Sequence, residues 1–183
     1  MRSALALLLA AGLLAAITAD VREARAQPME AAVKAAFLPK FAPYATWPST
    51  WAPAGGSPLV LCIVGRDPFG ALIDEAVEGA RRDASPIVVR RLARVERSSG
   101  CHIAYLGGSP VQPVTAALAA IAGAPMLTVT DARVGRDRGM LHFELRDGRV
   151  RFHIDDAAAA RAQLGVSSKL LSLALTVRQR GRS

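Results

Sequence analysis

The chain has 183 residues, enough for one domain, since single domains usually span about 100–200 residues. Because 51% of the residues are hydrophobic, an intrinsically disordered protein is excluded, and two cysteines are too few for a disulfide-rich miniature fold or a four-cysteine zinc module. The formal net charge of +8 would suggest nucleic acid as a partner, but part of that charge lies in a predicted targeting segment.

The first 26 residues have the pattern of a secretory signal peptide. Arg2 supplies a positive charge, Leu5–Ile17 is apolar, and Ala24–Ala26 forms a cleavage site with alanine at its first and third positions. The apolar run is shorter than the roughly 20 residues of a membrane-spanning helix, so we expect cleavage after Ala26 rather than an anchor. The remaining domain, 27–183, carries 20 basic and 13 acidic residues, because three arginines and two acidic residues are removed. The expected compartment is the periplasm, where the charge of +7 favours docking to an acidic surface or solubility over nucleic acid.

The rest of the chain alternates predicted helices and strands. An amphipathic helix with a kink at Pro39 is predicted over Met29–Tyr44. Further strands and helices follow from apolar runs and turn residues: strands at Leu59–Val64, Pro86–Leu92, Cys101–Leu106 and Met126–Thr130, and helices at Ala71–Val77 and Val111–Ala122.

A β-hairpin is predicted next, because Asp147-Gly148 is a two-residue loop that favours a type I′ turn. This loop fixes the register, so that Phe143 lies opposite Phe152 and His142 lies opposite His153. Two capped helices are expected after the hairpin, from Asp155 or Asp156 through Arg161 and from Ser167 or Ser168 through Thr176. The predicted fold is a three-layer α/β/α sandwich with a mixed, mostly parallel sheet and a C-terminal hairpin.

Several segments in this order resemble the YfiR-like family of periplasmic proteins. They are Phe41 with Trp47-Pro48, Leu61–Gly65 with Pro68–Gly70, Cys101–Tyr105, Leu127–Asp131, Arg151–Asp155 with Ala158, and Leu164–Leu171. The resemblance implies a non-catalytic regulator that binds the periplasmic sensing domain of an inner-membrane diguanylate cyclase and holds it inactive. Such repression lowers cyclic di-GMP and biofilm formation. Some members carry a second cysteine pair near the final hairpin, which this sequence lacks.

Cys62 and Cys101 are the two cysteines of the chain. Thiols exported to an oxidising compartment usually form a bridge, and neighbouring strands of the predicted sheet would place these two side by side. The resemblance implies the same disulfide. Two buried free thiols are the alternative.

The sequence gives little evidence for a catalytic or metal-binding site. His142, His153 and Asp155 share one region, but a zinc site needs another ligand and His102 lies on a different strand, so we expect no metal and a histidine pair that faces solvent or an interface. Ser167–Lys169 does not form a nucleophile pair, because these side chains diverge on a helix. No enzyme activity and no cofactor are expected.

The loop Gly65–Gly70 follows a strand at a place where α/β proteins bind ligands. Asp67 favours a turn or a helix cap, while Arg66 and Gly65 make a candidate anion or small-ligand site. A periplasmic small-ligand sensor or solute-binding module is therefore the alternative function, and an envelope assembly factor is a third.

Candidate partner-binding residues come from two parts of the chain. Tyr44, Trp47 and Trp51 lie in a proline-broken stretch that we expect at the surface, where aromatic residues often anchor interfaces. The last predicted helix, with Ser168 and Leu171, is apolar beyond one stripe, which favours burial or a protein contact. The expected protein is a homodimer that is not embedded in the membrane.

Overall fold

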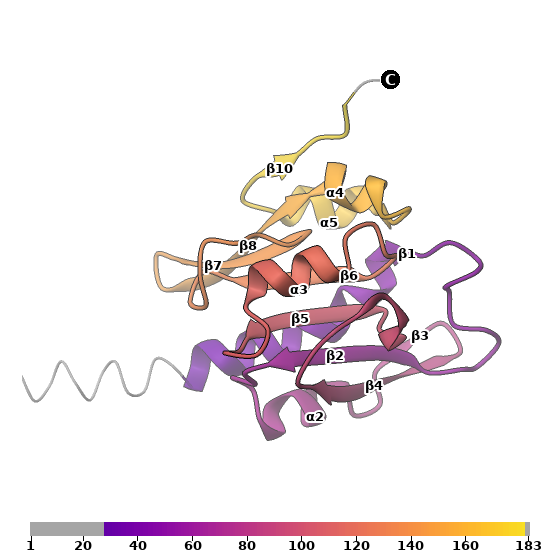
Figure 1. Cartoon of the computed structure of the whole chain (residues 1–183), viewed down its shortest axis with the longest axis horizontal. Helices are drawn as coiled ribbons and strands as arrows, with labels where there is room; N and C mark the ends of the chain where they lie inside the picture. Colours follow the sequence, from indigo (N-terminus) through magenta and orange to yellow (C-terminus); the bar gives the residue numbers. More distant parts are fainter. Residues whose placement is uncertain (1–27, 182–183) are drawn as a thin grey trace, which may run out of the picture.

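Eight strands form the central sheet of residues 28–181, which the structure, a computed structural model, describes (Figure 1). The strands of this sheet are β2 (Leu59–Gly65), β3 (Arg81–Arg82), β4 (Ser85–Leu92), β5 (Ile103–Gly108), β6 (Leu127–Asp131), β7 (Leu141–Arg146), β8 (Arg149–Asp155) and β10 (Val177–Arg178). Their order is β10-β8-β7-β6-β5-β2-β4-β3, with all neighbours from β4 to β7 parallel. The predicted signal peptide and its cleavage site lie outside the described residues.

Helices cover both faces of this sheet. They are residues 28–40, α2 (Ala71–Val77), α3 (Val114–Ala120), α4 (Asp156–Arg161) and α5 (Ser168–Leu173), with short 3₁₀ turns at Ala42–Tyr44 and Arg97–Ser99. Residues 28–40 and α2 pack on one face with the larger core cluster, and α3 packs on the other with the smaller cluster. The predicted α/β sandwich with a mostly parallel sheet is thus confirmed.

Strand β2 lies between the two core clusters. Leu61 and Ile63 belong to the larger cluster, whereas Cys62 and Val64 belong to the smaller one. Alternate side chains of a strand point to opposite faces, so an unbroken apolar run is what a strand covered on both sides requires.

The N-terminal helix packs on the C-terminal hairpin through aromatic rings. The ring centroid of Phe41 lies 5.8 Å from that of Phe143 and 5.5 Å from that of Phe152. Ala35 and Leu38, on the same face of the helix, are fully buried. These contacts join the two ends of the described chain in one core.

The hairpin has the predicted register. β7 and β8 pair with Phe143 opposite Phe152 and His142 opposite His153. Asp147 (φ 51°) and Gly148 (φ 70°) both adopt the left-handed conformation that a type I′ turn needs.

The end of the chain differs from the prediction. The helix expected through Thr176 stops at Leu173, because Ala174 is extended (φ −73°, ψ 148°). The amide of Leu175 then donates to the carbonyl of Phe152 (2.8 Å), and Val177 pairs with Ile154 of β8. Hydrogen bonding to this sheet edge outweighs helix continuation. The helix expected over Val111–Ala122 is also shorter, because α3 begins after Pro113.

The carboxyl ends of β2 and β5 come into close backbone contact. The amide of Arg66 donates to the carbonyl of Gly108 (2.9 Å). A Cβ on Gly107 would lie 1.9 Å from the carbonyl oxygen of Arg66, and a Cβ on Gly65 (φ +78°) would lie 2.6 Å from that of Gly108. Only glycine permits this approach.

We predict that Gly107→Ala destabilises the protein by about 3 kcal/mol or more, because the added methyl group meets backbone that must shift. Gly55→Ala is the control, since no atom lies within 4 Å of its new Cβ. Urea unfolding measures both. Equal midpoints for the two variants would contradict the close backbone contact.

Candidate functional site

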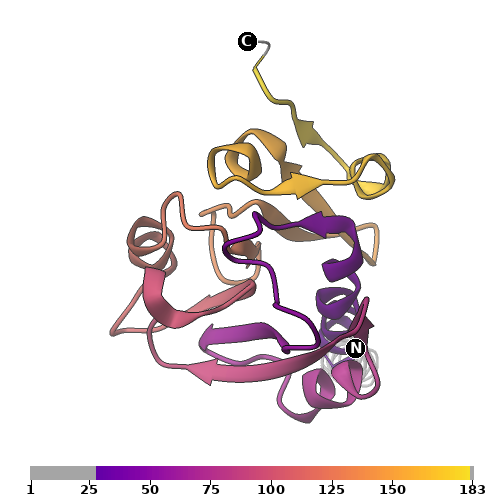
Figure 2. The same cartoon turned by 90° about the vertical axis from the view of Figure 1, so that its right-hand side faces the viewer.

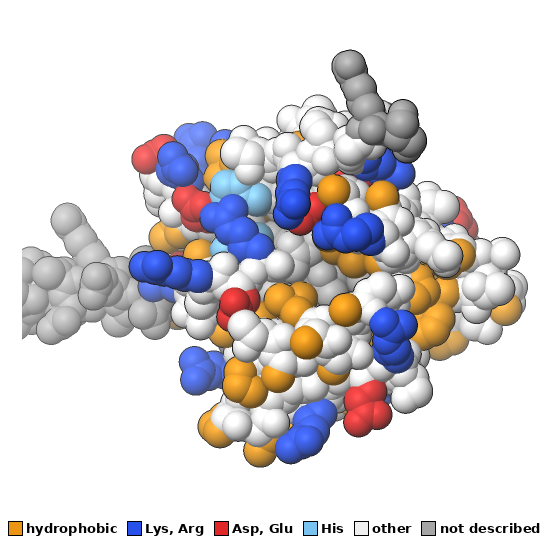
Figure 3. Space-filling view, turned by 45° about the horizontal axis from the view of Figure 1, so that its top comes forward, with side chains coloured by type: hydrophobic (Ala, Val, Ile, Leu, Met, Phe, Trp, Pro, Cys, Tyr) orange, Lys and Arg blue, Asp and Glu red, His pale blue; other side chains and the backbone are white. Residues whose placement is uncertain are grey.

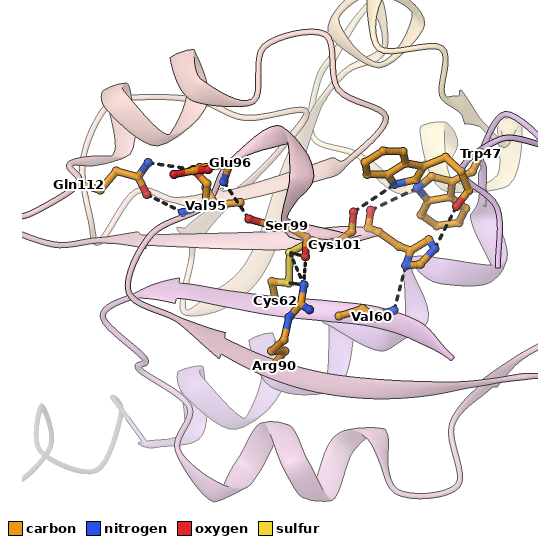
Figure 4. The surroundings of a disulfide bond; sticks show 11 residues. Trp47, Val60, Cys62, Arg90, Val95, Glu96, Ser99, Cys101 and Gln112 are labelled. Atoms are coloured by element: carbon orange, nitrogen blue, oxygen red, sulfur yellow. Dashed lines mark hydrogen bonds between the residues drawn. A yellow bond between two sulfur atoms is a disulfide. The ribbon is translucent and has the colours of Figure 1, made fainter. Parts of the chain in front are cut away.

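The two cysteines form the predicted disulfide. Cys62 of β2 and Cys101, two residues before β5, are joined with an S–S distance of 2.00 Å and both side chains are buried. Arg90 extends from β4 over the bridge, with Nη2 3.7 Å from Cys62 Sγ and 3.6 Å from Cys101 Sγ, and also donates to the carbonyl of Ser99 (Figure 4). The alternative of two free thiols is wrong, and the bridge ties adjacent strands together.

Two tryptophan side chains donate hydrogen bonds to backbone carbonyls next to this bridge. Trp47 Nε1 donates to the carbonyl of His102, and Trp51 Nε1 donates to that of Cys101, each over 3.2 Å (Figure 4). The imidazole of His102 accepts from the amide of Val60 (3.0 Å) and faces the carbonyl of Trp51 (3.1 Å). Burial lowers the pKa of His102, so the neutral ring holds both contacts.

The expectation that Trp47 lies at the surface is wrong, because it is only 5% exposed. Its indole N–H needs a buried acceptor, which the backbone beside the disulfide supplies, and the guanidinium of Arg82 lies 5.1 Å from its ring centroid. Trp51 is half-buried. The two indoles therefore connect the segment that follows the N-terminal helix to β5.

A short two-stranded ribbon brings the other candidate partner-binding residues together. β1 (Ala45–Thr46) pairs antiparallel with β9 (Gly165–Val166) in a two-stranded sheet of their own, and Figure 2 shows them side by side. The amide of Ser167 donates to the carbonyl of Tyr44 (2.9 Å) and its side chain accepts from the amide of Leu170, so Ser167 is the cap of α5. Tyr44 and Leu171 are half-buried, and Ser168 is exposed. We call this surface the ribbon face: Tyr44, Thr46, Ser168 and Leu171.

The paired histidines differ in their surroundings. His142 is only 3% exposed and lies 2.8 Å (Nδ1) from the hydroxyl of Thr130, so the expectation that the pair faces solvent is wrong for this residue. His153 contacts Glu144 (2.6 Å) and Thr176 (2.7 Å). On the face that Figure 3 shows, histidine side chains lie among basic and acidic side chains. Among residues 28–181, no group of three or more His, Cys, Asp or Glu side chains is arranged to hold a metal ion.

The loop after β2 is held by Asp67. Its Oδ1 accepts from the amides of Phe69 (2.8 Å) and Gly70 (3.1 Å), and its Oδ2 accepts from Arg91 Nε (2.8 Å). Asp67 thus forms the expected turn, and Arg66 lines a neighbouring cavity.

A network of buried charges forms the floor of that cavity. The ammonium of Lys34 lies 2.5 Å from Glu30 and 2.6 Å from Asp131. Glu30 also accepts from Arg133 (2.8 Å), and the hydroxyl of Tyr105 donates to Asp131 (3.4 Å). Lys34, Glu30 and Asp131 are 3%, 8% and 3% exposed. We call this set the Lys34 network.

The carboxyl ends of three strands position these groups. Arg66 follows β2, Tyr105 belongs to β5 and Asp131 ends β6, while Glu30 and Lys34 come from the N-terminal helix. Burial by itself would raise the pKa of Glu30, but the hydrogen bonds from Arg133 and Lys34 outweigh it and the pKa lies below its usual range. Burial and then the charge of Asp131 raise the pKa of Tyr105, so its hydroxyl stays protonated.

Of the two predicted ligand-site residues, Arg66 lines this cavity, whereas Gly65, the last residue of β2, is not part of its lining. The sequence alone did not indicate Glu30, Lys34, Tyr105 or Asp131 as site residues. A lysine on the apolar face of the first helix was the available signal, since buried lysines are rare without a partner.

We predict that replacing both cysteines with serine lowers the free energy of unfolding by about 4 kcal/mol, because the bridge closes a loop of about 40 residues in the unfolded chain. Urea unfolding under oxidising conditions measures this loss. Reductant should lower the midpoint of the wild type and leave the variant unchanged. A variant as stable as the oxidised wild type would contradict a stabilising bridge.

Acid should weaken the fold through His142. Burial first, and then the charge of Arg138, lowers its pKa to about 4, whereas the unfolded chain takes up this proton near pH 6.5. Stability is therefore full above pH 6.5 and falls as the pH drops towards 4, by about 1 kcal/mol per pH unit. Unfolding at several pH values should give a smaller slope for His142→Gln, which keeps the contribution from the lowered pKa of His102. Equal slopes would contradict a buried neutral His142.

Comparison with protein families gives a match over residues 31–175 to a family described as YfiR/HmsC-like. The curated proteins contain no match. None of the helices within residues 28–181 is long and apolar enough to cross a membrane. The matched segment includes the disulfide, the ribbon face and every described strand except β10. Since it covers most of the chain, the protein belongs to the YfiR/HmsC-like family.

Proposed function

We propose that this protein is a periplasmic, non-catalytic regulator that binds the periplasmic sensing domain of an inner-membrane diguanylate cyclase and represses it. Repression would lower cyclic di-GMP and biofilm formation. The observation that carries the proposal is the family match over residues 31–175. The disulfide between Cys62 and Cys101 supports it, because such bridges persist in oxidising compartments.

The docking surface that we propose is the ribbon face. Tyr44 and Leu171 keep part of their apolar surface accessible beside the exposed Ser168, and Leu173 at the end of α5 is 57% exposed. Apolar groups with a polar rim are typical of protein interfaces. Lys169 is exposed at this rim, so an acidic rim on the cyclase domain would complement it.

The disulfide and the two indoles stabilise the segment that carries this surface. Trp47 follows β1 directly and donates to the backbone beside Cys101. Their proposed role is to hold the ribbon rather than to touch the partner, although Trp51, half-buried, can contribute at its edge. The homodimer expected from the sequence remains a prediction.

Ser168→Arg tests the surface. Ser168 is exposed, so the variant should fold, and its bulky charged side chain should weaken capture of the cyclase from detergent-solubilised envelopes about tenfold. Mass spectrometry identifies the captured protein, and cyclic di-GMP in the cells should rise. Leu171→Asp gives a second variant on the same surface.

Ser57→Arg is the matched control, because Ser57 is exposed in the loop before β2. It should capture the cyclase like the wild type. Failure of the wild type to capture any inner-membrane diguanylate cyclase would refute the proposed partner. Equal capture by Ser168→Arg and Ser57→Arg would refute the proposed surface.

A further inference from the structure

The cavity above the Lys34 network lies where the strand order changes direction. From β2 the chain passes to β4 on one side, and then to β5 on the other side of β2. The connections that follow β2 and β5 therefore diverge at their carboxyl ends, which is where open α/β sheets bind ligands. The cavity measures about 390 Å³, within the range of small-molecule sites.

The cavity carries more positive than negative groups. Lys34, Arg66 and Arg133 line it together with Glu30 and Asp131, which leaves one basic group in excess. Arg133 is paired with Glu30, whereas the guanidinium of Arg66 has no partner among the described residues. Arg66 is therefore the basic group of the cavity lining that is left to bind an anion.

Lys34 also has hydrogen-bonding capacity left. A lysine ammonium has three donors, and the contacts with Glu30 and Asp131 use two of them. The ammonium is buried and lines the cavity, so a further acceptor has to reach it from there. Such an acceptor would offset the cost of leaving a buried donor unused.

Part of the cavity lining is apolar. The rings of Phe69 and Tyr105 meet edge to face with centroids 4.7 Å apart, and Ala31, Pro68 and Val134 belong to the same lining. A ligand with only an anionic group, such as phosphate, would leave these surfaces in contact with water.

We propose that the cavity binds a small organic monocarboxylate, with its carboxylate between Arg66 and Lys34 and its apolar part against Phe69 and Tyr105. The site is separate from the ribbon face. Glu30 and Lys34 lie near the start of the described helix, whereas Tyr44 follows its end. The inference therefore does not depend on the identity of the protein partner.

Calorimetry of the exported protein with benzoate and with its uncharged isostere benzamide tests the proposal. Benzoate should bind saturably and benzamide at least about tenfold more weakly, since an uncharged amide cannot form charge-assisted hydrogen bonds with Arg66 and Lys34. In amide NMR spectra, benzoate should shift the signals of Lys34, Arg66 and Tyr105. No saturable binding of benzoate at millimolar concentrations, or equal binding of benzamide, would overturn the proposal.

Arg66→Ala should weaken benzoate binding about tenfold, and the variant should fold because this side chain is exposed. Arg161→Ala is the control. Arg161 is exposed at the end of α4 and does not line the cavity. Its replacement by alanine removes the same positive charge. Equal affinities of the two variants, or benzoate shifts confined to the hairpin β7–β8, would overturn the site.

Discussion

The ammonium group of Lys34 is buried between two carboxylates that come from different parts of the chain. Glu30 lies one turn earlier on the same helix, and Asp131 lies 97 residues later, at the end of β6. Breaking a buried ion pair by removing one partner costs about 3–5 kcal/mol, because the remaining charge loses both water and its partner. The helix can therefore occupy only one position along its axis on the sheet.

That position decides how the rest of the domain packs. With Lys34 at Asp131, the next turns of the helix place Leu38 in the core and Phe41 against the rings of Phe143 and Phe152. The chain leaves the helix at Tyr44 and reaches β9 through β1. The Lys34 network at one end of the helix and the proposed docking surface, the ribbon face, beyond its other end are thus connected through one helix.

Local patterns allowed much of the fold to be predicted. The loop Asp147-Gly148 determines the hairpin register by its length, and the apolar run Leu59–Val64 fits only a strand covered on both faces. A serine cap for the last helix, at Ser167 or Ser168, could be predicted from the hydrogen-bonding capacity of the side chain, and the structure shows that Ser167 is the cap.

What could not be predicted depends on long-range contacts. A Glu30–Lys34 pair four residues apart is usually a solvent-exposed pair, and nothing local indicates that Asp131 completes it. Trp47 beside a proline is typical of an exposed turn, and nothing local indicates that the carbonyl of His102, just before β5, accepts its indole N–H. In the same way, β10 forms because the edge of β8 is free to pair, which a helical pattern near Leu171 does not show.

Hydrogen–deuterium exchange of the exported protein, with and without the periplasmic domain of the captured cyclase, tests the proposed function most directly. The account predicts slower exchange at residues 44–46 and 165–171 when the cyclase domain is bound, and unchanged exchange at residues 30–34. Protection confined to other surfaces, or no protection at saturating cyclase domain, would contradict it.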